Sequence, residues 1–341
     1  MSESNLQVTK KRVSICEIGK RDAEIQTDLI PVLKEMIAQN DDKYPGIERW
    51  FETKVLSGIK SGERIGYVAF ENEKPIAAAV LKLGESTKLC HLRIDENHQD
   101  QDLGQIFFIR MTLAALRYAN NIHFTLPESL WQMKAGFFKS FGFSDTARTL
   151  RQYRNDDIEL VCSASVKTVW SAVVRKLPHL LERFYTEEYS SDSNVLMSVK
   201  SHFAERIVSG EKSVELRKQF HSKWEGHEAI LYATKPTGSF VGKATICNVT
   251  HGSPTDIWAR FGSRIGCSKR DFDTYVGATQ EVAAVELDNV VRFENIVPLR
   301  QMADLLQQRL TPPQSYLELS FKKNRNMVTA VCLAELLQGR F

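Results

Sequence analysis

Residues 99–105 form a polar turn between two apolar segments, and their position suits the binding of a phosphate group. Residues 88–94 have the composition of a strand, and the segment from Leu103 to about Asn120 has the apolar spacing of a helix. A turn between a strand and a helix N-terminus presents backbone N–H groups without intrahelical partners, at the positive end of the helix dipole. We therefore expect this turn to bind a pyrophosphate.

The turn has neither the glycine fingerprint of dinucleotide-binding folds nor the Gly-x-x-x-x-Gly-Lys-Ser/Thr sequence of nucleotide hydrolases. It resembles the acetyl-CoA loop of the GNAT N-acetyltransferases, whose pattern is Gln/Arg-x-x-Gly-x-Gly/Ala. Gln99 matches the first position and Gly104 the last, whereas Asp102 replaces the middle glycine. The resemblance implies acetyl-CoA as acyl donor, bound by the strand and loop residues Leu92, Ile94, Gln99, Asp100, Gln101, Asp102, Leu103, Gly104 and Gln105.

The sequence leaves two interpretations of Asp102. If its carboxylate faces the cofactor, it repels the diphosphate, and the lost glycine restricts how closely the backbone can approach. Alternatively, Asp102 caps the helix that starts at Leu103, because an aspartate side chain at that position accepts hydrogen bonds from the free amides. In the second case the carboxylate turns away from the ligand.

The elements around the loop occur in the order expected of a GNAT domain. Two strands joined by a polar turn precede it, another strand follows, and a Phe-Phe-Lys-Ser-Phe-Gly-Phe segment resembles a helix end of that family: residues 65–70, 75–81, 122–126 and 137–143. The amphipathic segments 29–37 and 47–55 are expected to pack on the core. The resemblance covers residues 13–162 and implies an α/β fold.

Acetyl transfer to an amine needs a base for the ammonium and an acid for the leaving thiolate. The candidate catalytic bases are Glu96, just before the loop, and Glu128, just after the following strand. The tyrosine that often serves as the acid in the family is replaced by Phe138, which has no proton to donate. His91 and Arg93 share one face of a regularly alternating strand and are candidate contacts of the acceptor.

A second group of polar side chains, Lys212, Glu215, Arg217 and Lys218, lies in the second half of the chain. The sequence at 195–320 resembles the ASCH domain, a β-barrel relative of the PUA domains that bind RNA and modified nucleobases. The first three residues fall on the Gly-x-Lys-x-x-x-x-Arg stretch that lines the family's pocket, so the resemblance implies that this group contacts nucleic acid. Glu215 replaces the threonine of ASCH enzymes that hydrolyse acetylcytidine, which argues against that activity.

The pattern between and within these regions predicts a helical connector followed by an α+β domain. Residues 166–185 have helical apolar spacing with Pro178 inside, where a proline kinks or divides a helix. Beyond a polar linker, Ser201 and Gly210 are expected to cap and to end a short helix. Short strands follow on both sides of a Lys-Pro-Thr-Gly turn, which predicts a mostly antiparallel sheet.

The composition agrees with a globular protein of two domains and leaves its partner open. The chain has 341 residues, is 43% hydrophobic and has a formal net charge of +3, so it can form two cores without a strong basic excess. The six cysteines form no Cys-x-x-Cys pair and lack histidines at metal-ligand spacing, so no metal site is expected. The polar N-terminus and the lack of long apolar runs predict a cytoplasmic protein without a membrane segment.

We therefore expect a GNAT-like α/β domain at 1–162, a helical connector and linker at 163–194, an α+β, PUA-like ASCH β-barrel with helices at 195–320, and a basic tail with a helix at 321–341. The leading hypothesis is an acetyl-CoA-dependent N-acetyltransferase that its ASCH domain directs to RNA or an RNA-associated acceptor. One alternative is a regulatory nucleic-acid-binding protein with an acyl-CoA-sensing or degenerate GNAT domain. The other is hydrolysis of an acylated nucleoside in the ASCH pocket.

Overall fold

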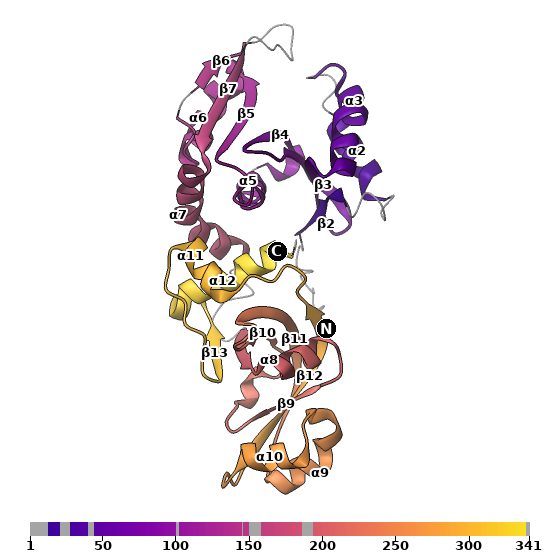
Figure 1. Cartoon of the computed structure of the whole chain (residues 1–341), viewed down its shortest axis with the longest axis vertical. Coiled ribbons are helices and arrows are strands. Elements are labelled where there is room, and N and C mark those ends of the chain that lie inside the picture. Colours follow the sequence, from indigo (N-terminus) through magenta and orange to yellow (C-terminus); the bar gives the residue numbers. More distant parts are fainter. Residues whose placement is uncertain are drawn as a thin grey trace, which may run out of the picture. The chain divides into compact units, whose positions relative to one another are not determined.

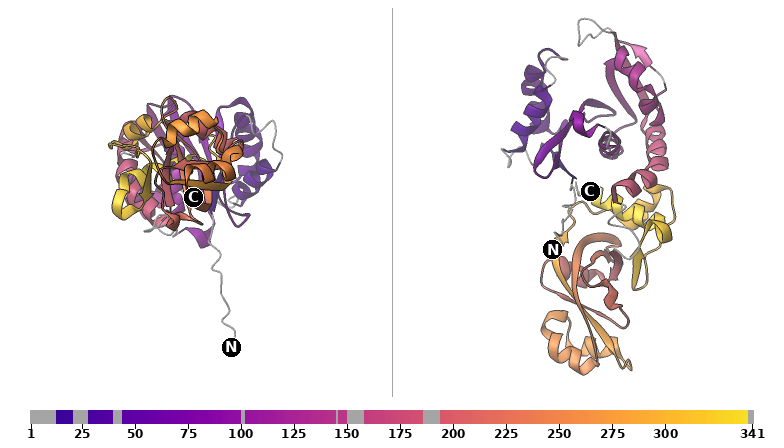
Figure 2. Two further views of the ribbon diagram at one scale, coloured as in Figure 1. Left: turned by 90° about the horizontal axis from the view of Figure 1, so that it is seen from below. Right: turned by 180° about the vertical axis from the view of Figure 1, so that it is seen from behind.

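The computed structural model of the protein describes residues 13–20, 28–39, 44–99, 102–144, 146–149, 158–185 and 194–338. The chain divides into two compact units, one of Met1–Lys176 with Gly339–Phe341 and one of Leu177–Gln338. Each unit is built on its own β-sheet (Figure 1). The views from below and from behind show the same elements (Figure 2).

The sheet of the N-terminal unit has seven strands in the order β1-β2-β3-β4-β5-β7-β6. Neighbouring strands are antiparallel except β4 and β5, which run parallel. The strands are β1 (Val13–Ile18), β2 (Arg64–Glu71), β3 (Lys74–Lys82), β4 (Ser86–Ile94), β5 (Asn121–Pro127), β6 (Thr146–Arg148) and β7 (Glu159–Ser165). The four strands predicted between residues 65 and 126 are confirmed as β2, β3, β4 and β5.

The hairpin of β2 and β3 turns through Asn72 and Glu73, whose φ angles are positive, at 47° and 68°. Two successive residues of this kind form the turn whose twist matches that of the flanking strands. Glu71 and Lys74 pair across the turn and fix the register of the hairpin. The polar turn predicted at this place is therefore confirmed.

The helices before β2 cover one face of the first strands. They are α2 (Leu29–Ala38), α3 (Ile47–Trp50), the π-helical segment η1 (Phe51–Leu56) and α4 (Ser57–Ser61). Leu33 of α2 and Val55 of η1 are fully buried and share a core with Val68 and Val80 of the sheet. The amphipathic segments predicted at 29–37 and 47–55 thus pack as expected, with a π-helical turn that the sequence did not indicate.

The later helices of this part of the chain are the 3₁₀ turn η2 (Glu96–His98), α5 (Leu103–Ala115), α6 (Glu128–Ser140) and α7 (Val166–Tyr185). α5 ends before the predicted Asn120, because the chain turns there to enter β5 and the N–H of Asn120 bonds to the Glu85 carbonyl at 2.8 Å. α7 has the bounds predicted from the sequence. Pro178 lies inside α7 and does not divide it.

The sheet of the C-terminal unit has six strands in the order β13-β8-β10-β11-β12-β9 and curls into a half-barrel (Figure 1). Only the β8–β10 pair is parallel, so the predicted mostly antiparallel sheet is confirmed. The strands are β8 (Asn194–Val199), β9 (Val214–Arg217), β10 (Glu228–Ala233), β11 (Ser239–Gly252), β12 (Val282–Arg292) and β13 (Tyr316–Leu319). Both strands predicted beside the Lys-Pro-Thr-Gly turn are present, as β10 and β11.

Helices surround this sheet: α8 (Ser201–Val208), the 3₁₀ turn η3 (Ser222–Trp224), α9 (Pro254–Ile265), α10 (Lys269–Val276), α11 (Leu299–Leu306) and α12 (Phe321–Leu337). Ser201 is the first residue of α8 and not its N-cap, because Lys200 accepts the first helical hydrogen bonds, from Phe203 and Ala204. Gly210 ends this segment with a φ of 84°, as predicted.

The C-terminal helix α12 belongs to the core of the second unit. Its last turns are buried, with Val328, Val331 and Leu336 fully inaccessible. The predicted apolar spacing of the tail therefore reflects packing, and α12 contacts α11 and β13 of the same unit.

Candidate functional site

The strands β4 and β5 pair over a short length only and then diverge. Their parallel pairing joins residues 86–88 to residues 121–123, three residue pairs in all. Beyond that point β4 continues to Ile94 beside β3, and β5 continues to Pro127 beside β7. In Figure 1 the two strands separate next to α5, which is seen nearly end-on. The sheet therefore opens at the C-terminal ends of β4 and β5, where the predicted loop begins.

A β-bulge lies in β4 within this region. Val80 of β3 pairs with His91, but the next residue, Leu81, pairs with Leu89, so Cys90 is an extra residue. A bulge of this kind disturbs the alternation of side chains and re-aims them. The regular alternation that we expected for this strand is therefore wrong.

Cys90 and His91 consequently both approach the same group of side chains. The sulfur of Cys90 accepts a hydrogen bond from Nη1 of Arg64 at 3.0 Å. The ring of His91 lies 6.4 Å from the ring of Trp50, which also lies under the Arg64 guanidinium at 6.0 Å. Burial and the neighbouring charge of Arg93 lower the pKa of His91 to about 4, so its imidazole is neutral at pH 7. Its Nε2 has no hydrogen-bond partner among the described residues.

Asp102 precedes α5 in the left-handed conformation, with a φ of 58°. Its side chain makes no capping hydrogen bond to the helix; Oδ1 instead accepts one from Nε2 of Gln105, at 2.5 Å. The capping interpretation is therefore wrong in its mechanism: the carboxylate binds a side chain, not the helix amides. Asp100 and Gln101, which we also expected at the cofactor, lie outside the described residues.

Gly104 lies in the first turn of α5, close to the strand that precedes the loop. A Cβ atom added there would be 3.3 Å from Cδ1 of Ile94 and 4.0 Å from Cζ of Phe137. Glycine thus allows close approach of α5 to β4. Leu92 is partly exposed, and exposed Gln99 donates a hydrogen bond from Nε2 to the Ile94 carbonyl at 3.4 Å. These predicted cofactor contacts thus cluster at the opening of the sheet.

The two candidate bases differ in their surroundings. Glu96 is exposed in η2. Glu128 is half-buried as the first residue of α6, directly after β5, and its N–H donates to the Ile158 carbonyl at 2.8 Å. Phe138 packs among aromatic rings, 4.9 Å from Phe124 and stacked on Trp131, and brings no proton donor to the site.

The sequence analysis missed a histidine that fixes the start of the loop. His98 is 8% exposed, with Nδ1 3.2 Å from Oδ1 of Asp95 and Nε2 3.3 Å from Oε2 of Glu71. A hydrogen bond from the Asn97 N–H, and then the one with His98, lower the pKa of Asp95. His98 thereby ties η2 to the β2–β3 hairpin. The Asp-x-x-His spacing was a signal that could have found it.

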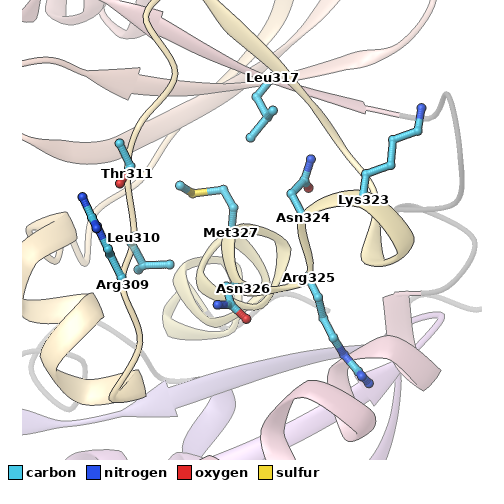
Figure 3. Close-up of a pocket in the computed structure, with 9 residues that line it drawn as sticks. All are labelled: Arg309, Leu310, Thr311, Leu317, Lys323, Asn324, Arg325, Asn326 and Met327. Atoms are coloured by element: carbon cyan, nitrogen blue, oxygen red, sulfur yellow. The ribbon is translucent and has the colours of Figure 1, made fainter.

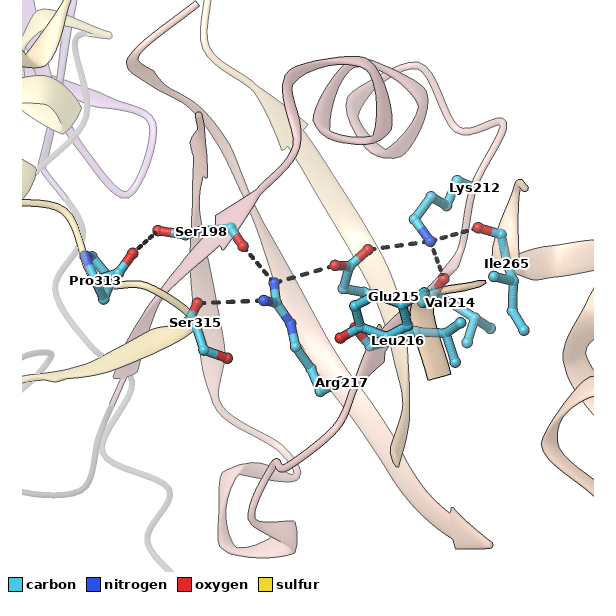
Figure 4. A network of polar contacts seen from close by, with 10 residues as sticks. Ser198, Lys212, Val214, Glu215, Leu216, Arg217, Ile265, Pro313 and Ser315 are labelled. Atoms are coloured by element: carbon cyan, nitrogen blue, oxygen red, sulfur yellow. Dashed lines mark hydrogen bonds and ion pairs between the residues drawn. The ribbon is translucent and has the colours of Figure 1, made fainter. Parts of the chain in front are cut away.

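In the C-terminal unit, Lys212 is buried and its ammonium is bound by protein groups (Figure 4). Nζ donates to the carbonyls of Val214 and Ile265 and lies 3.2 Å from Oε2 of Glu215. The position of Lys212 follows from the turn before β9, where its N–H bonds to the Arg206 carbonyl at 2.9 Å. This lysine therefore stabilises the packing between β9 and the end of α9.

Arg217 binds the other oxygen of the same carboxylate. Its Nη2 lies 3.2 Å from Oε1 of Glu215 and donates to the Ser198 carbonyl at 2.7 Å, and its Nη1 donates to the Ser315 carbonyl at 3.5 Å. One buried carboxylate thus binds two buried cations, and Arg217 links β9 to β8 and to the residue before β13. The structure brings Lys212, Glu215 and Arg217 together as the sequence predicted.

Lys218 is the exposed member of the predicted group. Its Nζ lies 5.7 Å from the ring centre of Tyr275, whose hydroxyl donates to the Leu216 carbonyl at 3.3 Å. Burial raises the pKa of Tyr275. A cation beside a partly exposed aromatic ring can contact both the phosphate and the base of a nucleic acid. Contact of this group with nucleic acid stays a prediction.

Among the described residues, no cluster of three histidine, cysteine or acidic side chains is arranged to hold a metal ion. In the same part of the chain, every helix is too short or too polar to cross a membrane.

Comparison with known proteins gives different matches for the two units. A family model described as a domain of unknown function, DUF365, matches residues 193–308. An ASCH domain-containing ribonuclease of Zymomonas mobilis is 26% identical over 142 residues, which are 41% of this chain and 93% of the ribonuclease.

Among solved structures, ASCH from Zymomonas mobilis is 25% identical, covers 40% of this chain and 95% of its own, and has a TM-score of 0.37. The ribosomal-protein-S18-alanine N-acetyltransferase of Escherichia coli is 14% identical, covers 45% of this chain and 94% of its own, and has a TM-score of 0.37. The strand order, the parting of β4 from β5 and the curled second sheet agree with the expected folds. The C-terminal unit is thus similar in sequence to an ASCH domain, and the N-terminal unit has the strand order and the parted parallel strands expected of a GNAT fold.

Proposed function

We propose that this protein is an acetyl-CoA-dependent N-acetyltransferase whose ASCH-like domain directs it to RNA or to an RNA-associated acceptor. The observation that supports the transferase is the opening between β4 and β5, which lies beside the N-terminus of α5. A thioester in such an opening would be held between two strands with helix amides at one end. We assign residues 1–162 to this activity and residues 195–320 to the partner, with 163–194 as the connector.

The loop residues fit the diphosphate of acetyl-CoA through their backbone. The first amides of α5 that have helical partners are those of Gln105 and Ile106, which both bond to the Asp102 carbonyl. The N–H groups of Leu103 and Gly104 precede this ladder and are the donors that a phosphate would use. The negative charge of Asp102 opposes binding of the diphosphate. The hydrogen bond that Gln105 donates to its carboxylate weakens this repulsion in part.

Acetyl-CoA, when bound, would supply the activated acyl group. Glu128 is the better base, because it is half-buried at the end of β5 whereas Glu96 is exposed. It would take the proton of the acceptor ammonium and leave the amine free to attack. His91 is neutral and lies on β4, so it would contact the acceptor without repelling a cation. Phe138 cannot protonate the leaving group, so the acid would be solvent or another side chain.

An RNA partner is supported by the relative of the C-terminal domain, which is named a ribonuclease. Lys218 beside Tyr275 offers an exposed cation and an aromatic ring for it. A second function, acyl-CoA sensing without catalysis, is favoured by Phe138 in place of the tyrosine, because the phenylalanine leaves the cofactor site without that acid. Both functions require acetyl-CoA to bind, so binding alone does not distinguish them. A measurement of acetyl transfer does, because only the transferase consumes the cofactor.

Isothermal titration of the full-length protein with acetyl-CoA tests the proposal. Gly104→Glu adds a carboxylate beside the loop amides and should abolish detectable binding. Gly104→Ala is the matched control: its Cβ would lie 3.3 Å from the flexible end of Ile94 and at an ordinary contact distance of 4.0 Å from Phe137, and binding should change by less than about threefold. A protein that binds no acetyl-CoA at millimolar concentration, or a Glu variant that binds as well as the Ala variant, contradicts the proposal.

A further inference from the structure

A cavity of about 450 Å³ lies in the C-terminal unit, between the segment that follows α11, strand β13 and the first turns of α12 (Figure 3). It shares no lining residue with the Lys212 network. Its lining combines three basic side chains, three uncharged polar ones and three apolar ones: Arg309, Lys323 and Arg325; Thr311, Asn324 and Asn326; Leu310, Leu317 and Met327. Neither the sequence motifs nor the proposed acetyl transfer uses this cavity.

An interruption near the start of α12 shapes the cavity. Asn324 has non-helical angles, φ −146° and ψ 55°, within the helix. Its side chain donates to the Glu318 carbonyl and accepts from the N–H of Ser320, which ties the interrupted turn to the end of β13. Ser320 in turn accepts a hydrogen bond from the Lys322 N–H. The cavity wall is therefore fixed by hydrogen bonds to the backbone, which favours a site formed before any ligand binds.

The floor of the cavity is apolar. Leu310, Leu317 and Met327 come from three separate segments and point toward its centre (Figure 3). Met327 is buried and begins the buried part of α12. Aliphatic and thioether side chains make good contact with the flat face of an aromatic ring. An inorganic anion would gain no favourable contact with this apolar floor, whereas a nucleobase would bury it.

Of the three basic side chains on the rim of the cavity, two are already bound by carboxylates of the protein. Arg325 donates from Nη2 to Oε2 of Glu182 at 2.6 Å, and Lys323 binds both oxygens of Glu318 at 2.7 and 2.8 Å. Arg309 is exposed, and within the described part of the chain it has neither an ion pair nor a side-chain hydrogen bond. Arg309 is thus the cation that a ligand can engage without displacing a carboxylate.

Two exposed polar side chains complete the rim. Thr311 lies two residues beyond Arg309, and Asn326 lies beside Met327 (Figure 3). A hydroxyl and a carboxamide can donate to and accept from the edge of a base or the hydroxyls of a ribose. One free guanidinium, uncharged donors and acceptors, and an apolar floor together match a phosphate, a sugar and a base.

We infer that this cavity binds a nucleotide, with the base on Leu310, Leu317 and Met327 and the phosphate at Arg309. The same chemistry belongs to a free nucleotide and to one residue of single-stranded RNA. The inference specifies the RNA contact of the proposed function but does not depend on acetyl transfer. It adds a second contact with RNA to the one proposed at Lys218 and Tyr275.

Fluorescence anisotropy of a fluorescein-labelled single-stranded RNA octamer with the full-length protein tests the inference, with AMP and inorganic phosphate as competitors. Arg309→Gln should weaken RNA and AMP binding about tenfold, the effect of one charge-assisted hydrogen bond. Thr311→Trp should fill the cavity and weaken binding at least as much. Lys322→Gln removes the same charge from an exposed neighbour outside the lining, and its effect should stay under about twofold. AMP should compete where equimolar phosphate does not.

Equal effects of Arg309→Gln and Lys322→Gln would overturn the inference, since they would mean a diffuse charge effect. Unchanged binding by Thr311→Trp, or equal competition by phosphate and AMP, would overturn it too. All three substituted residues are exposed, and unchanged melting temperatures would show that the variants fold. If AMP binds as tightly as the octamer, the ligand is the free nucleotide; if the octamer binds more tightly, it is RNA. Titration of the same variants with acetyl-CoA should give wild-type affinity, which separates this result from failure of the transferase proposal.

Discussion

Nζ of Lys212 lies 3.2 Å from Oε2 of Glu215, and the two residues are only 2% and 8% exposed. Because Arg217 binds the other oxygen, Glu215→Gln would leave two buried cations without their counter-charge. We expect it to lower the free energy of unfolding by about 3–5 kcal/mol. Urea denaturation measures this change. Glu211→Gln is the control: its ion pair with Arg206 is exposed, so its cost should stay below about 1 kcal/mol.

Lys218→Gln should weaken RNA binding by the full-length protein and reduce its dependence on salt, because one phosphate contact is lost. The slope of log affinity against log salt concentration should fall by about 0.7, the value for one contact to a single strand. Anisotropy titrations at several salt concentrations measure it. A slope that does not change would mean that Lys218 makes no phosphate contact. Because Lys218 is exposed, this variant tests the surface without the loss of stability expected for Glu215→Gln.

Asp102→Gly should stabilise the protein and tighten acetyl-CoA binding. The φ of 58° is a conformation that glycine adopts without strain, so the melting temperature should rise by an amount equivalent to about 0.5–1 kcal/mol. Binding should tighten because a negative charge leaves the phosphate site. Calorimetry and titration measure the two effects. Asp102→Asn tolerates the same φ and removes only the charge, so tighter binding with no gain in stability is expected there.

Glu128→Gln should lower kcat by about 10²–10⁴ with little change in KM, if Glu128 is the base. Glu96→Gln should leave kcat within about threefold, since Glu96 is exposed and lies before the loop. Steady-state acetylation of an amine acceptor, followed by thiol release, gives both constants. Equal losses in the two variants would remove the distinction between the two carboxylates.

His91 should make the protein less stable as the pH falls below neutrality. Its folded pKa of about 4 lies below the ordinary value near 6.5, so the unfolded chain takes up the proton first. The contribution of neutral His91 to the free energy of unfolding is fully present above pH 6.5 and is lost between pH 6.5 and about pH 4. Replacement by Gln should flatten the fall in melting temperature across this window. Asp95, whose pKa is also lowered, acts below its ordinary value of 3.8 and therefore outside the window.

The sequence predicted the elements whose signals are local. The β2–β3 hairpin and the strand, loop and helix around Gly104 follow from apolar periodicity and turn residues. The bulge at Cys90 did not follow, because it depends on the register between two strands. The burial of Lys212 was equally hidden, since its partner carbonyl on Ile265 is 53 residues away.

The cavity near Arg309 escaped prediction for the same reason. Its floor needs Leu310, Leu317 and Met327 to converge, and that depends on the interrupted turn at Asn324. The basic residues after Phe321 were visible in the sequence. The sequence did not show which of these residues are paired with a carboxylate, because Glu182, the partner of Arg325, is 143 residues away.

The divergence of β4 from β5 creates an edge inside a continuous sheet. Past their three residue pairs, the main-chain groups of β4 that face β5 no longer serve to join these two strands. An edge of this kind can extend its ladder to an amide-containing chain of another molecule. Because main-chain hydrogen bonds do not depend on side-chain identity, substitutions at Leu92 would reshape the opening and leave this ladder intact. Binding of such a chain to the main chain of β4 would therefore tolerate amino-acid substitutions that would disrupt a site built from side chains.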